Sequence, residues 1–342
     1  MKFLKTLIIH VLFAAGVCLA VWVSSFYRYP QHITPLITLG SGIILGTLVR
    51  YGGKIIPALG VGLFCAHYFL VGYIFFTSLW VSSTMLITGW IALCNMRRYV
   101  SADLIDRPVH NYLHFYVAAM LISPVINALL DLPLIWLLGY QELVPDIRLL
   151  IFSYSFGGAL GSLVFAPAII LFGRNYHLKY AYANYIDKRQ EKILWCVAAV
   201  CLITLTFFLG KRYFFAGLLD AELLLYPMMI WSALRLGVVF TNIAVAFVAY
   251  TVFTFHFFGL AGTSSEMSIP EVLGMLLLIV TLAILGQLVA ATALERRKKE
   301  ALLEKVANQA AVTGLPNTRS LYLRLKQLTY NELENGNKHW LG

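Results

Sequence analysis

The sequence has 342 residues, of which 60% are hydrophobic, 14% aromatic and only 12% charged. Soluble globular domains carry about 25% charged residues, so this chain lacks the charge that a water-facing surface requires. A soluble enzyme, a disordered chain and a secreted disulfide scaffold are therefore excluded. We expect an all-α integral membrane protein, a polytopic bundle of about ten transmembrane helices with a short cytoplasmic helical tail.

Ten apolar runs approach the ~20 residues that a spanning helix needs. The first half of the chain contributes 6–27, 33–50, 55–75, 77–96 and 112–138, and the second half contributes 149–172, 193–209, 214–236, 238–258 and 272–294. The first run follows Lys2 and Lys5 as a signal peptide would, but it is too long and has no A-x-A cleavage site. We therefore interpret it as a retained span.

The net charge of +10 is distributed unevenly between the loops. The loops on one side carry Lys2, Lys5, Arg50, Lys54, Arg97, Arg98, Arg107, Arg174, Lys179, Lys188, Arg189, Lys192 and Arg235. The opposite loops carry Arg28, Lys211 and Arg212, with Arg148 at a helix edge. Because short basic loops stay on the cytoplasmic side, this asymmetry predicts a multi-pass protein of the plasma membrane with both termini in the cytoplasm. It also removes the reason to expect a nucleic-acid partner.

One polar stripe interrupts the fifth apolar run. Ser123, Asn127 and Asp131 follow one another at four-residue intervals, so on a helix they share a face. Ionisable groups at membrane depth are costly and point to function, and we therefore take the stripe as a candidate ligand-sensing site. The alternative is structural, with Asp131 hydrogen-bonding a neighbouring helix near Pro133.

His67, in the third apolar run, is the fourth candidate sensing residue. Its imidazole, held neutral, has two alternatives. It pairs with the polar stripe, or it hydrogen-bonds a backbone carbonyl and has no special role.

The sequence contains no pattern for metal binding, cofactor binding or catalysis. The five cysteines lie in apolar runs and form no C-x-x-C pair, so we expect buried, inert thiols. H-E-x-x-H, Walker and G-x-S-x-G motifs are absent from the sequence. We therefore expect no catalytic residue, no metal and no cofactor in this chain.

Two glycine pairs have G-x-x-x-G spacing, Gly42 with Gly46 and Gly157 with Gly161. This spacing lets two helices approach closely. We interpret both pairs as packing devices within one bundle.

A charged cluster over 295–300, ERRKKE, ends the last apolar run, and a helical pattern continues beyond it. We expect three parts: a membrane domain over 1–294, a cytoplasmic helix or linker over 295–311, and a segment over 312–342. The last part is too short for an ordinary independent domain.

Four motifs give the membrane part a resemblance to a known family. They are Thr34-Pro35 followed by Gly40, Gly42 and Gly46; the run 50–60, RYGGKIIPALG; the run 156–161, FGGALG, with Pro167; and the run 227–237, PMMIWSALRLG. In order and spacing they resemble the class-one MASE family, bacterial membrane-associated sensor domains that precede cyclic-di-GMP signalling domains and histidine kinases. The resemblance implies an inner-membrane location and structural roles for Pro35, Pro57, Gly60, Gly157, Gly161, Pro167, Pro227, Trp231, Arg235 and Gly237. Two positions depart from the family pattern, because Thr34 replaces an aromatic residue and Gly158 an acidic one.

The tail resembles the opening of a GGDEF-type diguanylate cyclase domain, through Val312-Thr313-Gly314-Leu315-Pro316-Asn317. Ala310 and Thr318 stand where that family commonly has Asp and Arg, as in degenerate copies coupled to EAL-type phosphodiesterase domains. The resemblance implies a truncated GGDEF start, and a full-length parent that is a cyclic-di-GMP phosphodiesterase or diguanylate cyclase.

Two classes of function remain open. A sensory input module would pass an unknown signal through the last helix to a cytoplasmic output domain. Its partners would be the lipid bilayer, an unidentified small ligand or membrane partner, and a second copy through the cytoplasmic tail. A small-molecule transporter is the alternative, because proline- and glycine-broken helices in both halves are typical of transporters. The helix that continues into a signalling-domain start favours the sensor.

Overall fold

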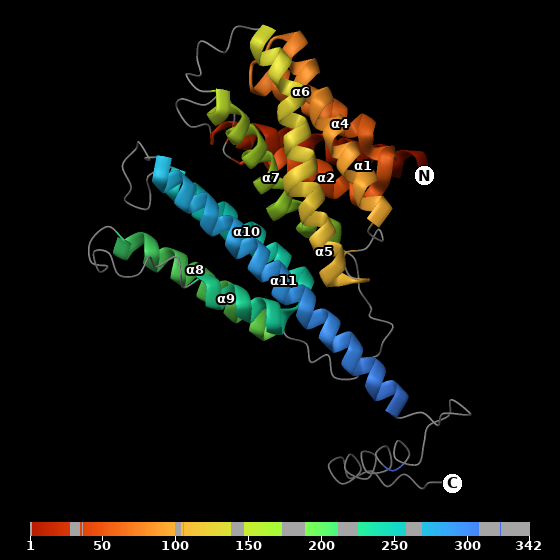
Figure 1. The fold of residues 1–342 in the computed structure, drawn as a ribbon, viewed down its shortest axis with the longest axis vertical. Coiled ribbons are helices and arrows are strands. Elements are labelled where there is room, and N and C mark those ends of the chain that lie inside the picture. Colours follow the sequence, from red (N-terminus) through yellow and green to blue (C-terminus); the bar gives the residue numbers. More distant parts are fainter. Residues whose placement is uncertain are drawn as a thin grey trace. The chain divides into compact units, whose positions relative to one another are not determined.

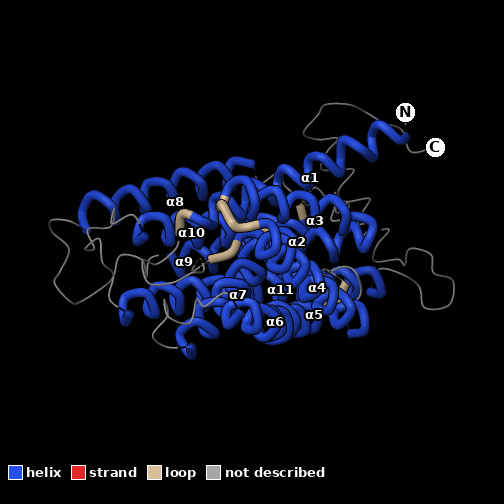
Figure 2. The backbone as a smooth tube through the Cα atoms, turned by 90° about the horizontal axis from the view of Figure 1, so that it is seen from above, coloured by secondary structure: helices blue, strands red, loops and turns tan. Residues whose placement is uncertain are grey.

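Every regular element that the computed structural model describes is a helix (Figure 1, Figure 2). The description covers residues 2–27, 35, 37–99, 104, 106–137, 147–172, 189–210, 225–257, 269–307 and 322. The α-helices are α1 (Lys2–Ser25), α2 (Leu39–Tyr51), α3 (Ile56–Cys65), α4 (Phe75–Tyr99), α5 (Pro108–Tyr116), α6 (Ser123–Leu137), α7 (Ile147–Leu171), α8 (Arg189–Gly210), α9 (Leu225–Trp231), α10 (Val238–Phe257) and α11 (Ile269–Ala307). Between them lie the 3-10 turn η1 (Gly52–Ile55) and the π-helical segments η2 (Ala66–Leu70), η3 (Val117–Ile122) and η6 (Ser232–Leu236). The predicted all-α class is confirmed for these residues.

By its internal contacts the chain divides into two compact units. Residues 1–175 and 186–294 form the helical bundle. Residues 176–185 and 295–342 form the second unit, of which the structure describes 295–307 and Tyr322. The expected division at 1–294, 295–311 and 312–342 stays a prediction, because most of the last two parts lies outside the described residues.

Five described stretches are long and apolar enough to cross a membrane: Leu7–Ser25, Leu39–Leu70, Phe75–Arg98, Pro108–Leu134 and Leu273–Leu303. Two shorter apolar helices are Ser155–Leu171 and Val238–Thr254. The expected count of about ten spans is not confirmed. Most of the second and third apolar runs of the sequence falls within one of these stretches, and the start of the eighth run lies outside the described residues.

The second stretch reverses its direction in the middle. Gly52 has a φ of 72°, a left-handed conformation that glycine adopts without strain, and it ends α2. After η1, α3 returns along α1, where His10 Nε2 lies 3.1 Å from Lys54 O and a Cβ on Gly62 would overlap Ala14. The second and third apolar runs are therefore separate helices joined by a turn.

Helix α2 lies against α7 through glycines on both helices. A Cβ on Gly42 would overlap Gly161 O and lie 2.8 Å from Phe165 Cβ. A Cβ on Gly46 would lie 2.9 Å from Ile169 Cβ. These backbone approaches are the kind that G-x-x-x-G spacing permits.

Helix α7 is shared between two groups of helices in the bundle (Figure 1). It contacts α2 and α6 of the N-terminal group, and it also contacts α10. A buried apolar core joins α7 to α8–α11, with Leu163, Trp195, Met229, Val245 and Leu282 among its members. A change in the position of α7 would therefore alter the packing of both groups of helices.

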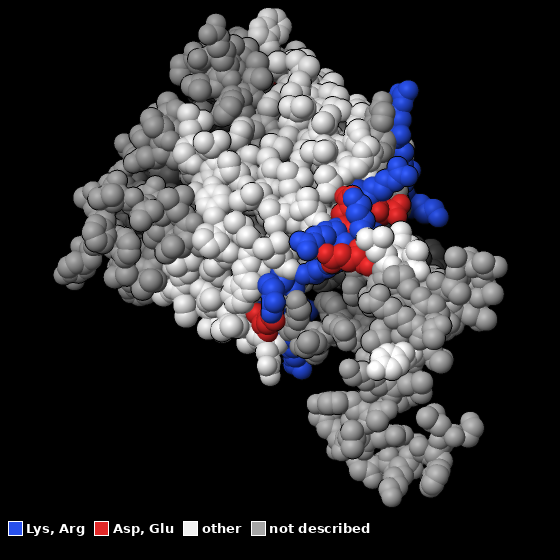
Figure 3. Space-filling view, turned by 60° about the horizontal axis from the view of Figure 1, so that its bottom comes forward, with Lys and Arg blue, Asp and Glu red and all other residues white. Residues whose placement is uncertain are grey.

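Several exposed cations of the bundle lie at one end of α2 and α4, and two others, Arg189 and Arg235, lie on α8 and in η6. Lys54 lies in η1, Arg97 and Arg98 lie in the last turn of α4, and Arg107 precedes α5. Figure 3 shows the charged side chains in one band, while the other described side chains on that face are uncharged. A band of this kind is expected where a membrane bundle meets water.

The five cysteines require a correction. Cys94, Cys196 and Cys201 are exposed, and Cys18 and Cys65 are partly exposed, so none is buried within the bundle. The apolar sequence context could not separate core-facing from outward-facing positions, because both faces of a spanning helix are apolar.

Candidate functional site

The residues of the polar stripe lie on α6, and two of them, Asn127 and Asp131, contact hydroxyl groups of the neighbouring helix α4. The Thr84 hydroxyl of α4 donates to Asp131 Oδ1 at 2.8 Å, and Asn127 Nδ2 donates to Asp131 Oδ2 at 3.1 Å. Thr88 Oγ1, one turn further along α4, lies 3.4 Å from Asn127 Oδ1. Asp131 is 1% exposed. It therefore does hydrogen-bond a neighbouring helix, and any role towards a ligand depends on the space beside it.

Irregular helix geometry accompanies both parts of the candidate site. Ser123 directly follows the π-helical η3, and Pro124 beside it has no N–H to donate to a regular helix. His67 lies inside the π-helical η2, which ends just before Gly72 with a φ of 83°. Such π-helical segments often occur at functional sites.

His67 is buried and packs against α4. Its Nδ1 lies 3.0 Å from Ser82 Oγ, and its ring stacks on Tyr73 with the ring centroids 5.8 Å apart. This hydroxyl partner was not among the two alternatives drawn from the sequence. The contact fixes the imidazole between η2 and α4.

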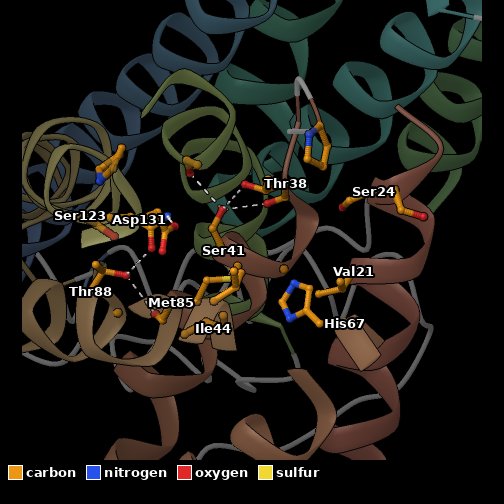
Figure 4. A pocket seen from close by; sticks show the side chains of 18 of the residues that line it. Val21, Ser24, Thr38, Ser41, Ile44, His67, Met85, Thr88, Ser123 and Asp131 are labelled. Atoms are coloured by element: carbon orange, nitrogen blue, oxygen red, sulfur yellow. Dashed lines mark hydrogen bonds between the residues drawn. The ribbon is translucent and has the colours of Figure 1, made fainter. Parts of the chain in front are cut away.

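A cavity of about 90 Å³ lies between α1, α2, η2, α4, α6 and α7, and all four candidate sensing residues line it. Figure 4 shows Asp131, Ser123 and Thr88 on one side of this cavity, and His67 and Ser24 on the opposite side. Polar groups lie on two sides of the cavity and the rest of its lining is mainly apolar, so a space of this size can hold a small amphipathic ligand or a few waters. The stripe and His67, 64 residues or fewer apart along the chain, thus belong to one site.

Two side chains, one just before α2 and one in its first turn, hydrogen-bond α7 at the edge of the cavity. The Thr38 N–H and hydroxyl both donate to Gly157 O, at 3.2 and 2.9 Å. The Ser41 hydroxyl lies 3.0 Å from Gly158 O and 2.7 Å from Thr38 O. One turn later, Gly161 has no room for a Cβ, which would lie 2.8 Å from Ser41 Oγ. The wall of the cavity therefore rests on the glycines of α7.

The structure brings only some of the family-motif residues to the cavity. Pro35 lines it, and Gly157 and Gly161 support its wall. The others lie elsewhere: Pro57 and Gly60 on α3, Pro167 near the end of α7, Pro227 and Trp231 on α9, Arg235 in η6 and Gly237 directly after it. Arg235 forms an ion pair with Glu191 of α8 at 2.9 Å. Because the Arg235 side chain is exposed, this pair contributes only modestly to the stability of the fold. Gly237 has a φ of 90°, which gives it a turn-forming role.

Sequence reasoning missed the partners on the facing elements. Thr84 and Thr88 are four residues apart and would share a helix face, which is the same signal that identified the stripe. Thr38 and Ser41 carry no such local signal. The role of Thr38 depends on Gly157, which lies 119 residues further along the chain.

The site offers hydrogen bonds and one carboxylate. In the part of the chain that the structure describes, no group of three or more His, Cys, Asp or Glu side chains could hold a metal ion. Asp131 and His67 lie on opposite sides of the cavity (Figure 4). The arrangement suits recognition of a small polar molecule.

Over the described residues, these features define a helical membrane protein with a cavity whose mainly apolar lining carries polar groups on two sides. The MASE1 family model matches residues 6–298, and the chain belongs to the MASE1 family. MASE1 is a family of membrane-associated sensor domains in signalling proteins, so the resemblance of the four sequence motifs is confirmed. No curated protein and no solved structure matches the sequence. No match supports the expected GGDEF-type start, and residues 308–321 lie outside the described part of the chain.

Proposed function

We propose that the chain is the input module of a bacterial inner-membrane signalling protein. It recognises a small ligand in the cavity, or alternatively a membrane partner, and passes the signal through α11 to a cytoplasmic output domain. Membership of the MASE1 family supports the sensory role. The resemblance of the tail to a GGDEF start supports a cyclic-di-GMP phosphodiesterase or diguanylate cyclase as the full-length parent.

The observation that carries this proposal is the length of α11. The helix has 39 residues, and Met275, Ile279 and Ala283 near its start are buried in the bundle. At 1.5 Å per residue it is about 58 Å long, whereas the hydrocarbon core of a bilayer is about 30 Å thick. The surplus supports a helix that leaves the membrane and reaches an output domain.

The cavity and the exposed cations lie towards opposite ends of the same helices. Gly40 and Ser41 in the first turn of α2 line the cavity, as does Tyr73 just before α4. Lys54 follows the other end of α2, and Arg97 lies in the last turn of α4. Because basic ends stay in the cytoplasm, this arrangement supports a cavity that faces the periplasmic half of the membrane.

Reporter fusions test this orientation. Alkaline phosphatase is active only where its disulfides form, outside the cytoplasm. Fusions after Tyr140 and Gly262 are expected to be active, and fusions after Arg107, Asp187 and Lys299 to be silent. The measurement is phosphatase activity per amount of fusion protein. Activity at Asp187 would contradict the proposed topology.

The test of the signalling role changes the rotation of α11. Residues 1–307 are joined to an intact diguanylate cyclase domain, and two or seven alanines are inserted after Lys299. Two residues rotate the downstream helix by about 200°, whereas seven return it to within about 20° of its original phase.

Two inserted alanines are expected to change cyclic-di-GMP output by about fivefold or more, the lower end of typical coupling energies. Seven are expected to leave it close to the parent value. Cyclic-di-GMP is measured together with membrane abundance of the fusion. Equal output from all three fusions would contradict signalling through α11 and favour the transporter alternative.

A further inference from the structure

We infer that the cavity binds a small organic cation, a protonated primary amine with a short apolar body, and that its ammonium group lies against Asp131. The inference rests on the proposed function in taking this cavity as the input site, and it names the class of ligand. It goes beyond membership of the family, which specifies no ligand.

The first argument is charge. Among the described residues that line the cavity, Asp131 is the one acidic residue, and no Lys or Arg is present. The described partners of its carboxylate are the neutral Thr84 and Asn127. No ion pair in the described part of the chain includes Asp131. A buried carboxylate without a countercharge favours a cationic ligand over a neutral or anionic one.

The second argument is the geometry of the acceptors. A carboxylate offers about four acceptor positions, and the structure shows one donor on each oxygen of Asp131. Asn127 Oδ1, next to it, has Thr88 Oγ1 at 3.4 Å, a long contact that leaves acceptor capacity. Both groups come from the same side of the cavity. Their convergence matches the three N–H donors of a primary ammonium group.

The third argument concerns a single proton. The Thr84 hydroxyl lies 2.9 Å from Val81 O and 2.8 Å from Asp131 Oδ1, but it carries one proton. When Asp131 is protonated, it can donate to Thr84, which donates to Val81 O. When an ammonium group arrives, the carboxyl proton leaves to solvent and the Thr84 hydroxyl turns to Asp131. Binding of the cation thus changes a hydrogen bond between α4 and α6. The other titratable groups of the lining are His67 and Tyr73, which stack on each other.

The rest of the cavity lining is mainly apolar and would contact the apolar body of the ligand. Ile44 and Met85 lie between the two polar sides, and Val21 lies beside His67 (Figure 4). A cavity of about 90 Å³ admits a chain of a few carbons rather than a large hydrophobe. The site therefore favours a short alkyl or similarly compact amine.

The test uses three probes of matched size and different charge. The full chain, purified in detergent, is titrated with butylammonium chloride, 1-butanol or sodium butyrate at constant ionic strength, and its thermal unfolding is followed. Butylammonium is expected to raise the unfolding temperature saturably, while butanol and butyrate do not. A matching rise with sodium chloride alone, with butanol or with butyrate would overturn the proposal.

Variants locate the effect. Asp131→Asn keeps the shape and removes the charge, and it is expected to abolish the butylammonium shift. Gly158→Leu fills the cavity from α7, where a Cβ meets only Pro124 at 3.8 Å, and it should abolish the shift with the carboxylate intact. Asp106→Asn, at an exposed acidic residue before α5, is the matched control and should keep the shift. An unchanged shift in either cavity variant would overturn the proposal, and so would its loss in the control.

This experiment is independent of the alanine insertions in α11. Failure of the amine to bind would leave the phase dependence of the output intact. Loss of phase dependence would leave amine binding intact. The two proposals can therefore fail separately.

Discussion

Gly161→Ala is expected to destabilise the protein strongly. A Cβ at this position would overlap the carbonyl oxygen of Thr38, lie 2.7 Å from its carbonyl carbon and lie 2.8 Å from Ser41 Oγ. Two of these three atoms belong to backbone that cannot move aside by rotating a side chain. Thr38 is also held to α7 by its two hydrogen bonds to Gly157 O. We expect a loss of about 3 kcal/mol or more, the upper end for overpacked sites.

The measurement is thermal unfolding in detergent, together with the amount of protein recovered from membranes. Gly16→Ala in α1 is the matched control, because a Cβ there meets nothing within 4 Å and the residue also lies inside a helix. It is expected to be neutral or to stabilise by about 0.5–1 kcal/mol through the better helix propensity of alanine. If the two variants unfold at the same temperature, the close contact between α2 and α7 is wrong.

The glycine pairs show which part of the helix packing could be predicted from the sequence. G-x-x-x-G spacing indicated close helix contacts at Gly42 and Gly161. It could not indicate that these two glycines lie against each other, nor that Gly161 meets the segment before α2. Local spacing reports the face of a helix, whereas the partner of that face is fixed by the whole bundle.

The candidate site likewise has residues that the sequence could predict and residues that it could not. The four-residue spacing of the stripe was sufficient to put Asn127 and Asp131 on one face, and an ionisable group within an apolar run marked that face as functional. The hydroxyls of Thr38 and Ser41 were not predictable, because such groups are common in membrane helices and their importance follows from distant contacts. The hydroxyl partner of His67 was missed for the same reason.

The number of spans was the least predictable property of the fold. Hydropathy finds apolar runs, but the length of a run does not show whether a helix crosses the membrane alone or turns within it. The turn at Gly52 separates the helices of the runs 33–50 and 55–75 as predicted, but together they form one apolar stretch of 32 residues, Leu39–Leu70. The all-helical class was predictable because an apolar chain must satisfy its backbone hydrogen bonds internally.

Helix α7 offers a physical route from the cavity to the output helix. At the cavity, Gly157 and Gly158 accept hydrogen bonds from Thr38 and Ser41. Further along α7, Leu163 O accepts a hydrogen bond from Gln287 Nε2 of α11 at 3.0 Å. A displacement of α7 by a ligand would therefore act directly on α11.

Gln287→Leu is expected to uncouple the cavity from the output while leaving the fold intact. The Gln287 side chain is fully buried, and its Oε1 has no hydrogen-bond partner among the described residues. Leucine removes this unsatisfied oxygen together with the bond to Leu163, so we expect stability to change by less than about 1 kcal/mol. The hydrogen bond from Gln287 of α11 to Leu163 O of α7 is lost.

The measurement is a double-mutant cycle in the fusion of residues 1–307 to a cyclase domain. Gly158→Leu, which fills the cavity, is expected to change cyclic-di-GMP output by about fivefold or more in the parent fusion. In the Gln287→Leu background its effect should largely disappear. Leu277→Ala, on an exposed position of the same helix, is the control and should leave the effect of Gly158→Leu unchanged. An equal effect of Gly158→Leu in the parent and Gln287→Leu backgrounds would show that the signal does not pass through this contact. If Gly158→Leu has no effect in the parent fusion, the cavity is not the input site, because filling the input site has to shift the equilibrium between the signalling states.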